Sequence, residues 1–321
     1  MSSIMNLRCV SGTLALLFSA GLLCAAGQQT LFPTPDDAVK ALVTATEAKD
    51  QGALTAIFGP DREKLLSGDP IEDANALSRF ATSLRKSVKL NRVDDAKFTL
   101  LVGEDDFPFP IPLVKEGSQW RFDTAAGLDE VLSRRIGQNE LSTIMTCRAY
   151  VIAQWEYFTQ PLDTSEDGLA VYAQRFISTP GKRDGLYWDV AEGEKPSPMG
   201  ALITEARAEG YPAGHRPEAA AGDAPAPHRG MPYHGYFFRI LKAQGEHAPG
   251  GKFSYVINGN MIAGYALLAY PEKWGASGVM SFIVNQQGRV YQKNLGADTA
   301  AIASAMTEYD PDPSWTLVRE P

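Results

Sequence analysis

The stretch "RRIGQNELSTIMTCRAYVIAQWEYFTQ" constrains the fold more than any other part of the sequence. Its apolar residues recur three or four positions apart, which predicts a long amphipathic helix over residues 139–159. The apolar stripe comprises Ile144, Cys147, Val151, Trp155 and Phe158. Because a helix of this kind buries its apolar face, we expect other segments to build a surface against it.

That surface is expected far along the chain, in "GVMSFIVNQQGRVYQKNLG" (residues 278–296). This segment predicts two strands joined by a tight turn, in which Gly288 is free to adopt a positive φ. Met280, Phe282 and Val284 share one face of the first strand, and we expect that face to be buried. Three earlier runs rich in aromatic and β-branched residues also predict strands: "GYFFRIL", "FSYVING" and "IAGYALLAYP".

The first half of the chain predicts helices followed by strands. A helix begins after Thr34, with Pro35 at its first position and Asp37 at the acidic position of a capping box. Two further helical patterns precede four strand-like runs: "VKLNRV", "AKFTLLVG", "FPIPLVKE" and "SQWRFDT". Helices followed by a meander, and then a helix with a further sheet, indicate an α+β protein.

We expect two domains, at residues 31–127 and 128–321. The second contains a Pro/Ala/Gly-rich insertion near 191–233, which is too poor in large apolar residues to form a core. The net charge of −8 argues against a nucleic-acid partner, because phosphate contacts require a basic surface.

Residues 1–27 have the pattern of a secretory signal peptide: Arg8, an apolar run too short to span a bilayer, and small residues before a cleavage site. We therefore expect a periplasmic or secreted protein with no transmembrane segment after cleavage. Lipidation at Cys24 is the alternative to simple cleavage. Either way Cys147 has no cysteine partner for an internal disulfide in the mature chain.

Four segments resemble the uncharacterised bacterial family called domain of unknown function 2950: "RRIGQNELSTI", "YAQRFISTPGKRDGLYW", "GEKPSPMG" and "ASGVMSFIVNQQGRVYQKNLGADTAAIASAM". The resemblance covers nearly the whole mature chain. It implies no activity, because the family name carries none.

The second half also resembles the soluble region of type IV pilins and type II secretion pseudopilins. The similar segments are "NELSTIMTCRAYVIAQWEYF", "HGYFFRIL", "AGYALLAYP" and "SGVMSFIVNQQGRVY". The resemblance implies an antiparallel sheet laid across the long helix. It departs from the pilin pattern in "GLDEVLSRRIGQNE", a polar segment where pilins carry an apolar helix that packs into the filament. The pattern of the first half resembles the cone-shaped fold of nuclear transport factor 2, which can enclose a pocket.

Two groups of residues are candidates for binding. Arg134, Arg135 and Glu140 lie where the halves meet, and we expect them to pin the domains together, with binding of an anionic ligand as the alternative. The second group consists of Asp163, Ser165 and Asp167. Their alternation resembles the first half of a calcium loop, although position twelve is a Gln rather than a Glu. A solvated turn is the alternative, and we expect no cofactor.

Other polar features suggest structural roles. "GEDDFPFPIP" (residues 103–112) predicts an exposed turn, with acid–base chemistry by its carboxylates as the alternative. Cys147 lies on the apolar stripe, which is typical of a buried structural thiol. None of the four histidines forms a pair at zinc-ligand spacing.

These features predict an exported, non-catalytic binding or assembly module of the bacterial envelope, with an envelope protein as its partner. The first alternative is a small-molecule-binding protein that uses a pocket in the first domain. The second is a hydrolase whose site is assembled from positions far apart in sequence. The oligomeric state stays open.

Overall fold

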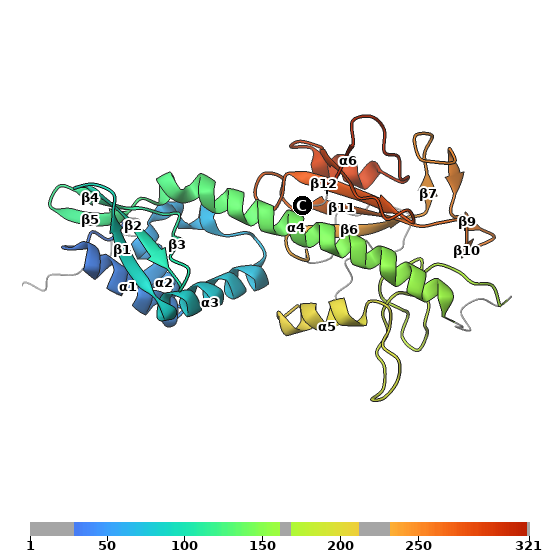
Figure 1. Ribbon diagram of the computed structural model, residues 1–321, viewed down its shortest axis with the longest axis horizontal. Helices are drawn as coiled ribbons and strands as arrows, with labels where there is room; N and C mark the ends of the chain where they lie inside the picture. The colour runs from blue at the N-terminus through green and yellow to red at the C-terminus, as the bar shows by residue number, and fades with distance from the viewer. Residues whose placement is uncertain (1–28, 161–167, 212–231, 320–321) are drawn as a thin grey trace, which may run out of the picture.

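The computed structural model describes residues 29–160, 168–211 and 232–319 and has an α+β fold, as predicted. Its helices and strands form two hydrophobic cores, which the long helix α4 connects (Figure 1). Across the described residues, no helix is long and apolar enough to cross a membrane. The signal-peptide prediction for residues 1–27 lies outside this part of the chain.

The first core is built by helices packed on an antiparallel sheet. Its helical elements are α1 (Pro35–Glu47), α2 (Gln51–Phe58), the 3-10 helix η1 (Pro60–Leu65) and α3 (Pro70–Lys86). Its strands are β1 (Val88–Arg92), β2 (Lys97–Val102), β3 (Phe107–Pro108), β4 (Leu113–Glu116) and β5 (Gln119–Phe122). They are arranged in the order β1-β2-β4-β5, and β3 pairs with the last two residues of β2. This order is the predicted meander.

Local signals define the helix starts in this half. The Thr34 hydroxyl accepts a hydrogen bond of 3.1 Å from the backbone N–H of Asp37, as the capping pattern predicts. Asp50 and Asp69 cap α2 and α3 in the same way. The apolar faces of these helices then meet the sheet around Leu42, Leu100 and other fully buried side chains.

Helix α4 (Thr124–Thr159) is longer than the predicted helix, which began at residue 139. Its first turns pack on the first core, where Val131 contacts buried residues. The Cα of Gly127 lies so close to Ile111 that a Cβ at this position would be 2.7 Å from the Ile111 Cα. The predicted helix left out residues 124–138 because of their charged side chains, although Leu128, Val131, Leu132 and Ile136 recur there at helical spacing.

The second core surrounds a five-stranded antiparallel sheet in the order β14-β13-β12-β11-β6. Its strands are β6 (Tyr236–Leu241), β11 (Ala266–Pro271), β12 (Met280–Asn285), β13 (Tyr291–Asn294) and β14 (Thr316–Leu317). Two short ribbons flank it: β7 (Ala243–Gln244) with β8 (Phe253–Ser254), and β9 (Val256–Ile257) with β10 (Asn260–Met261). The predicted hairpin is confirmed: β12 pairs with β13, and Gly288 has φ of 73°.

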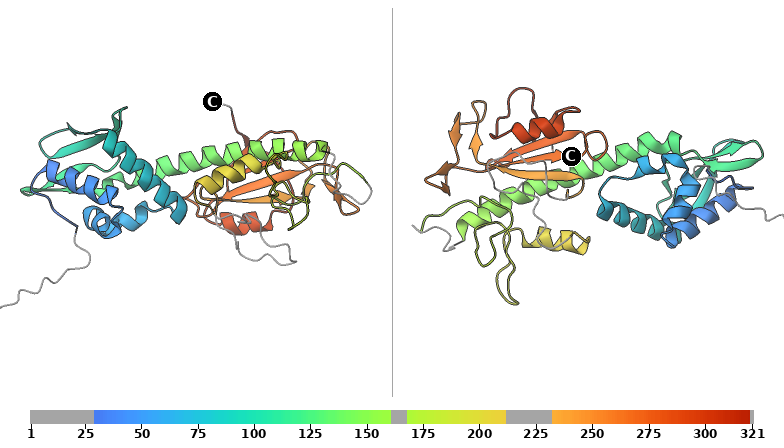
Figure 2. Two further views of the ribbon diagram at one scale, coloured as in Figure 1. Left: turned by 90° about the horizontal axis from the view of Figure 1, so that it is seen from below. Right: turned by 180° about the vertical axis from the view of Figure 1, so that it is seen from behind.

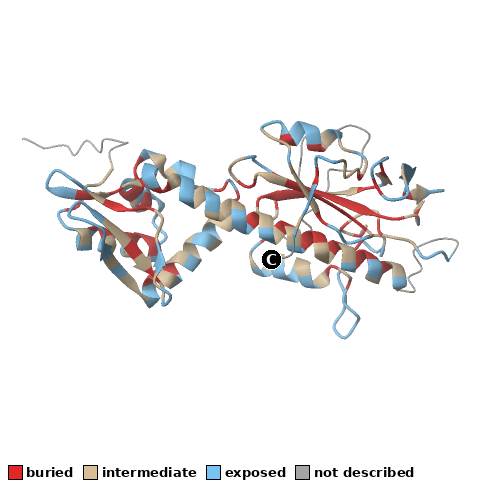
Figure 3. Cartoon of the chain, turned by 45° about the horizontal axis from the view of Figure 1, so that its top comes forward, coloured by how far each residue is buried: buried red, intermediate tan, exposed pale blue. Residues whose placement is uncertain are grey.

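Helices cover both faces of this sheet (Figures 1 and 3). The face that carries Phe282 and Phe238, which lie on either side of Ala269, packs against α4. On the opposite face Arg239 donates a hydrogen bond of 3.0 Å to the carbonyl of Ser304, at the end of α6 (Thr299–Ala305). Ile283, next to Phe282 in sequence, is consequently buried as well. The strand thus buries both of its faces, whereas the sequence predicted one.

One expectation for the stripe of α4 was wrong. Trp155 is 59% exposed and stacks on Phe158, with ring centroids 6.0 Å apart. The side of the helix that faces the sheet instead carries Cys147, Tyr150 and Gln154, all fully buried. Trp155 follows Gln154 directly and points about 100° away from it, because each residue turns an α-helix by that angle.

Part of the predicted loose insertion is ordered. Helix α5 (Gly200–Ala208) lies beside α4 in two views (Figures 1 and 2), and Met199 before it is buried in the second core. Leu202 and Ile203 of α5 also pack against this core. Short apolar clusters between turns gave too weak a periodic signal to predict this helix. Residues 212–231 of the insertion lie outside the described structure.

Candidate functional site

The predicted residues Arg134 and Arg135 fasten the start of α4 to the first core. The Arg134 guanidinium pairs with Glu130 at 2.7 Å, donates to the carbonyl of Pro108 at 3.0 Å, and lies 4.5 Å from the ring centroid of Phe107. Arg135 donates to two carbonyl oxygens at the end of η1. Both side chains therefore hold α4 against elements that precede it in sequence.

Glu140 performs the equivalent task for the second core. Its carboxylate accepts hydrogen bonds of 2.9 Å from the backbone N–H groups of both Val279 and Met280, where β12 begins. The structure thus places Arg134, Arg135 and Glu140 along one helix, with partners in different cores. It does not bring the three together in one site.

The remaining candidates for chemistry are the predicted calcium ligands and the thiol of Cys147. Asp163, Ser165 and Asp167 lie outside the described residues. Within the described ranges, no group of three or more His, Cys, Asp or Glu side chains is arranged to hold a metal ion. Cys147 is fully buried, and burial raises the pKa of its thiol to about 12, so the thiolate required of a nucleophile is strongly disfavoured.

The outer face of α4 carries an exposed apolar row that consists of Leu141, Met145, Ile152 and Trp155. These side chains are 63%, 68%, 68% and 59% exposed, in chain order. Steps of four, seven and three residues keep them on one side of a helix that turns about 100° per residue. Large apolar residues exposed singly are ordinary, whereas a contiguous row of them marks an interaction site.

The exposed row shares Trp155 with the apolar stripe predicted from the sequence, but its other residues lie further around the helix. Trp155 was expected in the core, since apolar periodicity is the same for a buried face and for an exposed apolar face. Leu141, Met145 and Ile152 were missed for that reason. Their 3-4 spacing was present in the sequence as a second stripe, offset from the buried one.

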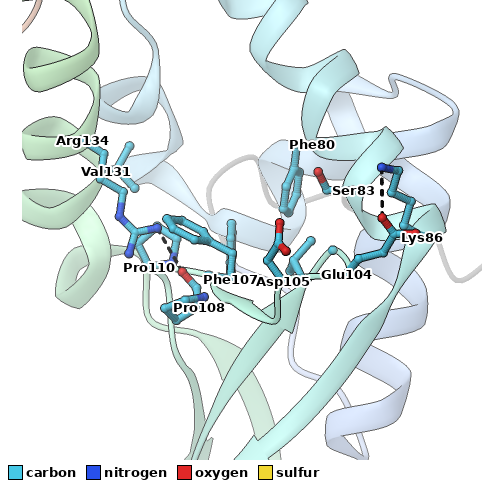
Figure 4. Close-up of a pocket in the computed structure, with 13 residues that line it drawn as sticks. Phe80, Ser83, Lys86, Glu104, Asp105, Phe107, Pro108, Pro110, Val131 and Arg134 are labelled. Atoms are coloured by element: carbon cyan, nitrogen blue, oxygen red, sulfur yellow. Dashed lines mark hydrogen bonds and ion pairs between the residues drawn. The ribbon is translucent and has the colours of Figure 1, made fainter. Parts of the chain in front are cut away.

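A pocket of about 510 Å³ lies near the start of α4, between α3 and the turn that joins β2 to β3 (Figure 4). Three phenylalanines contribute to its lining: Phe80, Phe107 and Phe109. Phe80 stacks on Phe109 with centroids 5.0 Å apart, while Phe107 is 59% exposed. The turn belongs to the "GEDDFPFPIP" segment, which was predicted to be exposed. In the structure this segment also forms one wall of the pocket.

The pocket and the apolar row share one face of α4. Arg134, which lines the pocket, lies seven residues before Leu141 and eighteen before Ile152. At about 100° per residue, these spacings place the three within about 20° of one another around the helix axis. The pocket and the row thus form one exposed, partly concave apolar surface along this face of α4.

Residues 29–318 match the family described as "Protein of unknown function (DUF2950)". The chain belongs to this family, as the sequence resemblance indicated. No curated protein and no solved structure matches the chain.

Proposed function

We propose that this chain is an exported binding or assembly module of the bacterial envelope, which docks an amphipathic helix of a partner protein on the outer face of α4. The observation that carries the proposal is the exposed row Leu141, Met145, Ile152 and Trp155. Export is supported by the signal-peptide pattern of residues 1–27. A helix laid across an antiparallel sheet supports the likeness to pilin-type envelope proteins.

The shape of the row favours a helix as its occupant. From Leu141 to Trp155 the row extends over fourteen residue steps, or about 21 Å at about 1.5 Å per residue. Its 3-4-type spacing is that of the seam between two packed helices. The flanking residues Ile144 and Val151 are partly buried and widen the apolar strip. A helix of about four turns would cover the strip.

Charge argues for a different protein rather than a second copy of this chain. Arg148 lies at the centre of the row by spacing and is half-buried. An antiparallel pair of α4 helices centred on the row would place Arg148 beside its own copy, and so would a parallel pair in register. Like charges at such a contact are unfavourable. A partner helix with a carboxylate at its centre does not incur this repulsion.

The test uses a labelled synthetic helix of three heptads, with leucine at positions a and d and one central glutamate. The peptide is kept below the concentration at which it self-associates, and its binding is measured by fluorescence anisotropy. We expect micromolar binding, and about tenfold weaker binding when lysine replaces the glutamate, equivalent to about 1.4 kcal/mol. Ile152→Glu should weaken binding of the glutamate peptide by at least as much.

Val93→Glu is the matched control, because Val93 is also exposed (54%) but lies in a turn of the first core, away from α4. It should leave binding unchanged. The helical-partner proposal is wrong if both peptides fail to bind. It is also wrong if light scattering shows a dimer of the chain that Ile152→Glu dissociates, since a second copy then occupies the row.

A further inference from the structure

The pocket at the start of α4 carries a carboxylate that plays no part in the exposed apolar row. Its β2–β3 turn carries three consecutive carboxylates, and the outer two are each paired: Glu104 with Lys86 at 3.5 Å, and Asp106 with Lys89 at 2.7 Å. Asp105, between them, has no hydrogen bond or ion pair to any described residue. In Figure 4 its carboxylate points into the pocket, toward Phe80.

We infer that this pocket binds a small organic cation, namely a soluble amine or quaternary ammonium compound attached to an apolar body. Asp105 supplies the charge that recognises the cation, and the phenylalanine-lined wall receives the apolar body. The inference rests on the pocket alone and is independent of the docking proposal.

The charges around the pocket balance except at Asp105. Lys86 is paired with Glu104, and Arg134 is paired with Glu130. Among the lining residues and their ion-pair partners, one negative charge therefore remains. A cationic ligand neutralises it, whereas an anionic ligand would have to break one of the existing pairs. Charge complementarity thus selects the sign of the ligand.

The aromatic side chains favour a cation of low charge density. The faces of aromatic rings attract ammonium and guanidinium groups, and quaternary ammonium ligands are commonly held in this way. Phe107 already attracts a cation here, since the Arg134 guanidinium lies 4.5 Å from its ring centroid. In Figure 4 the Asp105 carboxylate lies next to the side chain of Phe80, and Phe107 lies to one side of it. An ammonium group at that place would meet a carboxylate and aromatic rings together.

The pocket also has room for an apolar body. Its volume of about 510 Å³ is within the range of small-molecule sites, roughly 300–1,000 Å³. Besides the phenylalanines, the apolar part of its lining consists of Val102, Pro108, Pro110 and Val131. A bare inorganic cation would leave these surfaces unused, so an amine with an aromatic or aliphatic group is the better fit.

The experiment compares three probes that share one phenyl ring and a short chain: 2-phenylethylamine, 2-phenylethanol and 3-phenylpropionate. At pH 7 they carry a positive charge, no charge and a negative charge. Each is titrated into the full mature chain, with binding measured from NMR chemical-shift changes of the backbone amides. We expect the amine to bind about tenfold more tightly than the alcohol, and the carboxylate to bind weakest. The shifts should centre on residues 103–110.

Asp105→Asn should reduce the affinity for the amine about tenfold and leave that for the alcohol unchanged. Asp106→Asn is the matched control, because it neutralises the adjacent carboxylate, which is paired with Lys89 and does not line the pocket. Asp106 has φ of 52°, and asparagine tolerates this left-handed conformation. The control variant should bind the amine like the unmodified chain.

Three results would overturn the inference. They are binding of none of the probes at millimolar concentration, tighter binding of the carboxylate than of the amine, and equal loss in the two variants. A lipid headgroup is distinguished by cosedimentation with phosphatidylethanolamine vesicles. Sedimentation that Asp105→Asn abolishes would assign the site to the headgroup and refute the soluble amine.

Discussion

The carboxylate of Glu140, near the middle of α4, accepts a hydrogen bond of 2.9 Å from the backbone N–H of Met280, the first residue of β12. The same oxygen atom accepts a second bond of 2.9 Å from Val279. One side chain thus binds two backbone groups at the start of a strand that lies far away in sequence. This contact sets where along the helix the strand begins.

We predict that Glu140→Ala lowers the free energy of unfolding by about 2–3 kcal/mol, because two partly buried N–H groups lose a charged acceptor. Glu140→Gln keeps an acceptor oxygen and should cost less, about 1 kcal/mol. Urea unfolding followed by circular dichroism measures both. Equal costs for the two variants would show that these hydrogen bonds do not hold the strand.

Truncation of Phe282 should cost far more stability than truncation of Trp155, although sequence patterns placed both in one core. Phe282 is fully buried, so Phe282→Ala should cost about 3–5 kcal/mol. Trp155 is 59% exposed, and Trp155→Ala should cost no more than about 1 kcal/mol, mainly from its stacking on Phe158. Thermal unfolding of the two variants is the measurement. A large loss for Trp155→Ala would contradict its exposed position.

Two glycines of α4 provide a matched pair. A Cβ at Gly127 would lie 2.7 Å from the Ile111 Cα, whereas one at Gly137 would meet no atom within 4 Å. We expect Gly137→Ala to stabilise the protein by about 0.5–1 kcal/mol, because alanine is the better helix former. Gly127→Ala should destabilise it despite the same gain in propensity, because backbone has to move. The close approach of α4 to Ile111 is refuted if both variants gain stability.

Tyr211, which follows α5, connects this part of the chain to the start of α3. Its hydroxyl donates a hydrogen bond of 2.7 Å to the carboxylate of Asp69, which caps α3, and accepts one from the backbone N–H of His234. Tyr211→Phe removes this link and should cost about 1–3 kcal/mol. In this variant the hydrogen exchange of the backbone amides at the start of α3 should become faster. Unchanged exchange at Ile71 and Glu72, which Asp69 caps, would contradict the link.

Asp184 should contribute to acid sensitivity. Burial raises the pKa of its carboxyl, but hydrogen bonds from Thr179 and the charge of Arg175 outweigh burial, and the net shift is downward. The stability from this group is therefore present above the unfolded-state pKa of about 3.9, and is lost as pH falls through the lower folded-state pKa. The side chain is 34% exposed, which limits the contribution to less than about 1 kcal/mol.

Asp184→Asn tests this dependence. The variant should be less stable than the unmodified chain at pH 6, and the difference should shrink below about pH 4. Stability is measured by urea unfolding at each pH. A difference that grows on acidification would mean that the folded-state pKa is raised rather than lowered.

The sequence by itself determined the local elements. Thr34 and Asp37 predicted the start of α1, and Gly288 predicted the turn between β12 and β13. The α+β class and the family were also read from residue patterns. Such signals depend on hydrogen bonds, backbone angles and periodicity within a few residues. They can therefore be predicted without knowledge of distant segments.

Only the tertiary structure decided which apolar face of α4 is covered. The sheet and the segment that carries Ala173 and Phe176 pack on the side of the helix that carries Tyr150. This leaves Trp155 and Ile152 exposed. Likewise, the pocket exists because Phe80 of α3, the turn at Asp105 and the start of α4 meet in space. Burial and charge pairing depend on which distant segments pack together, and a one-dimensional pattern does not contain that information.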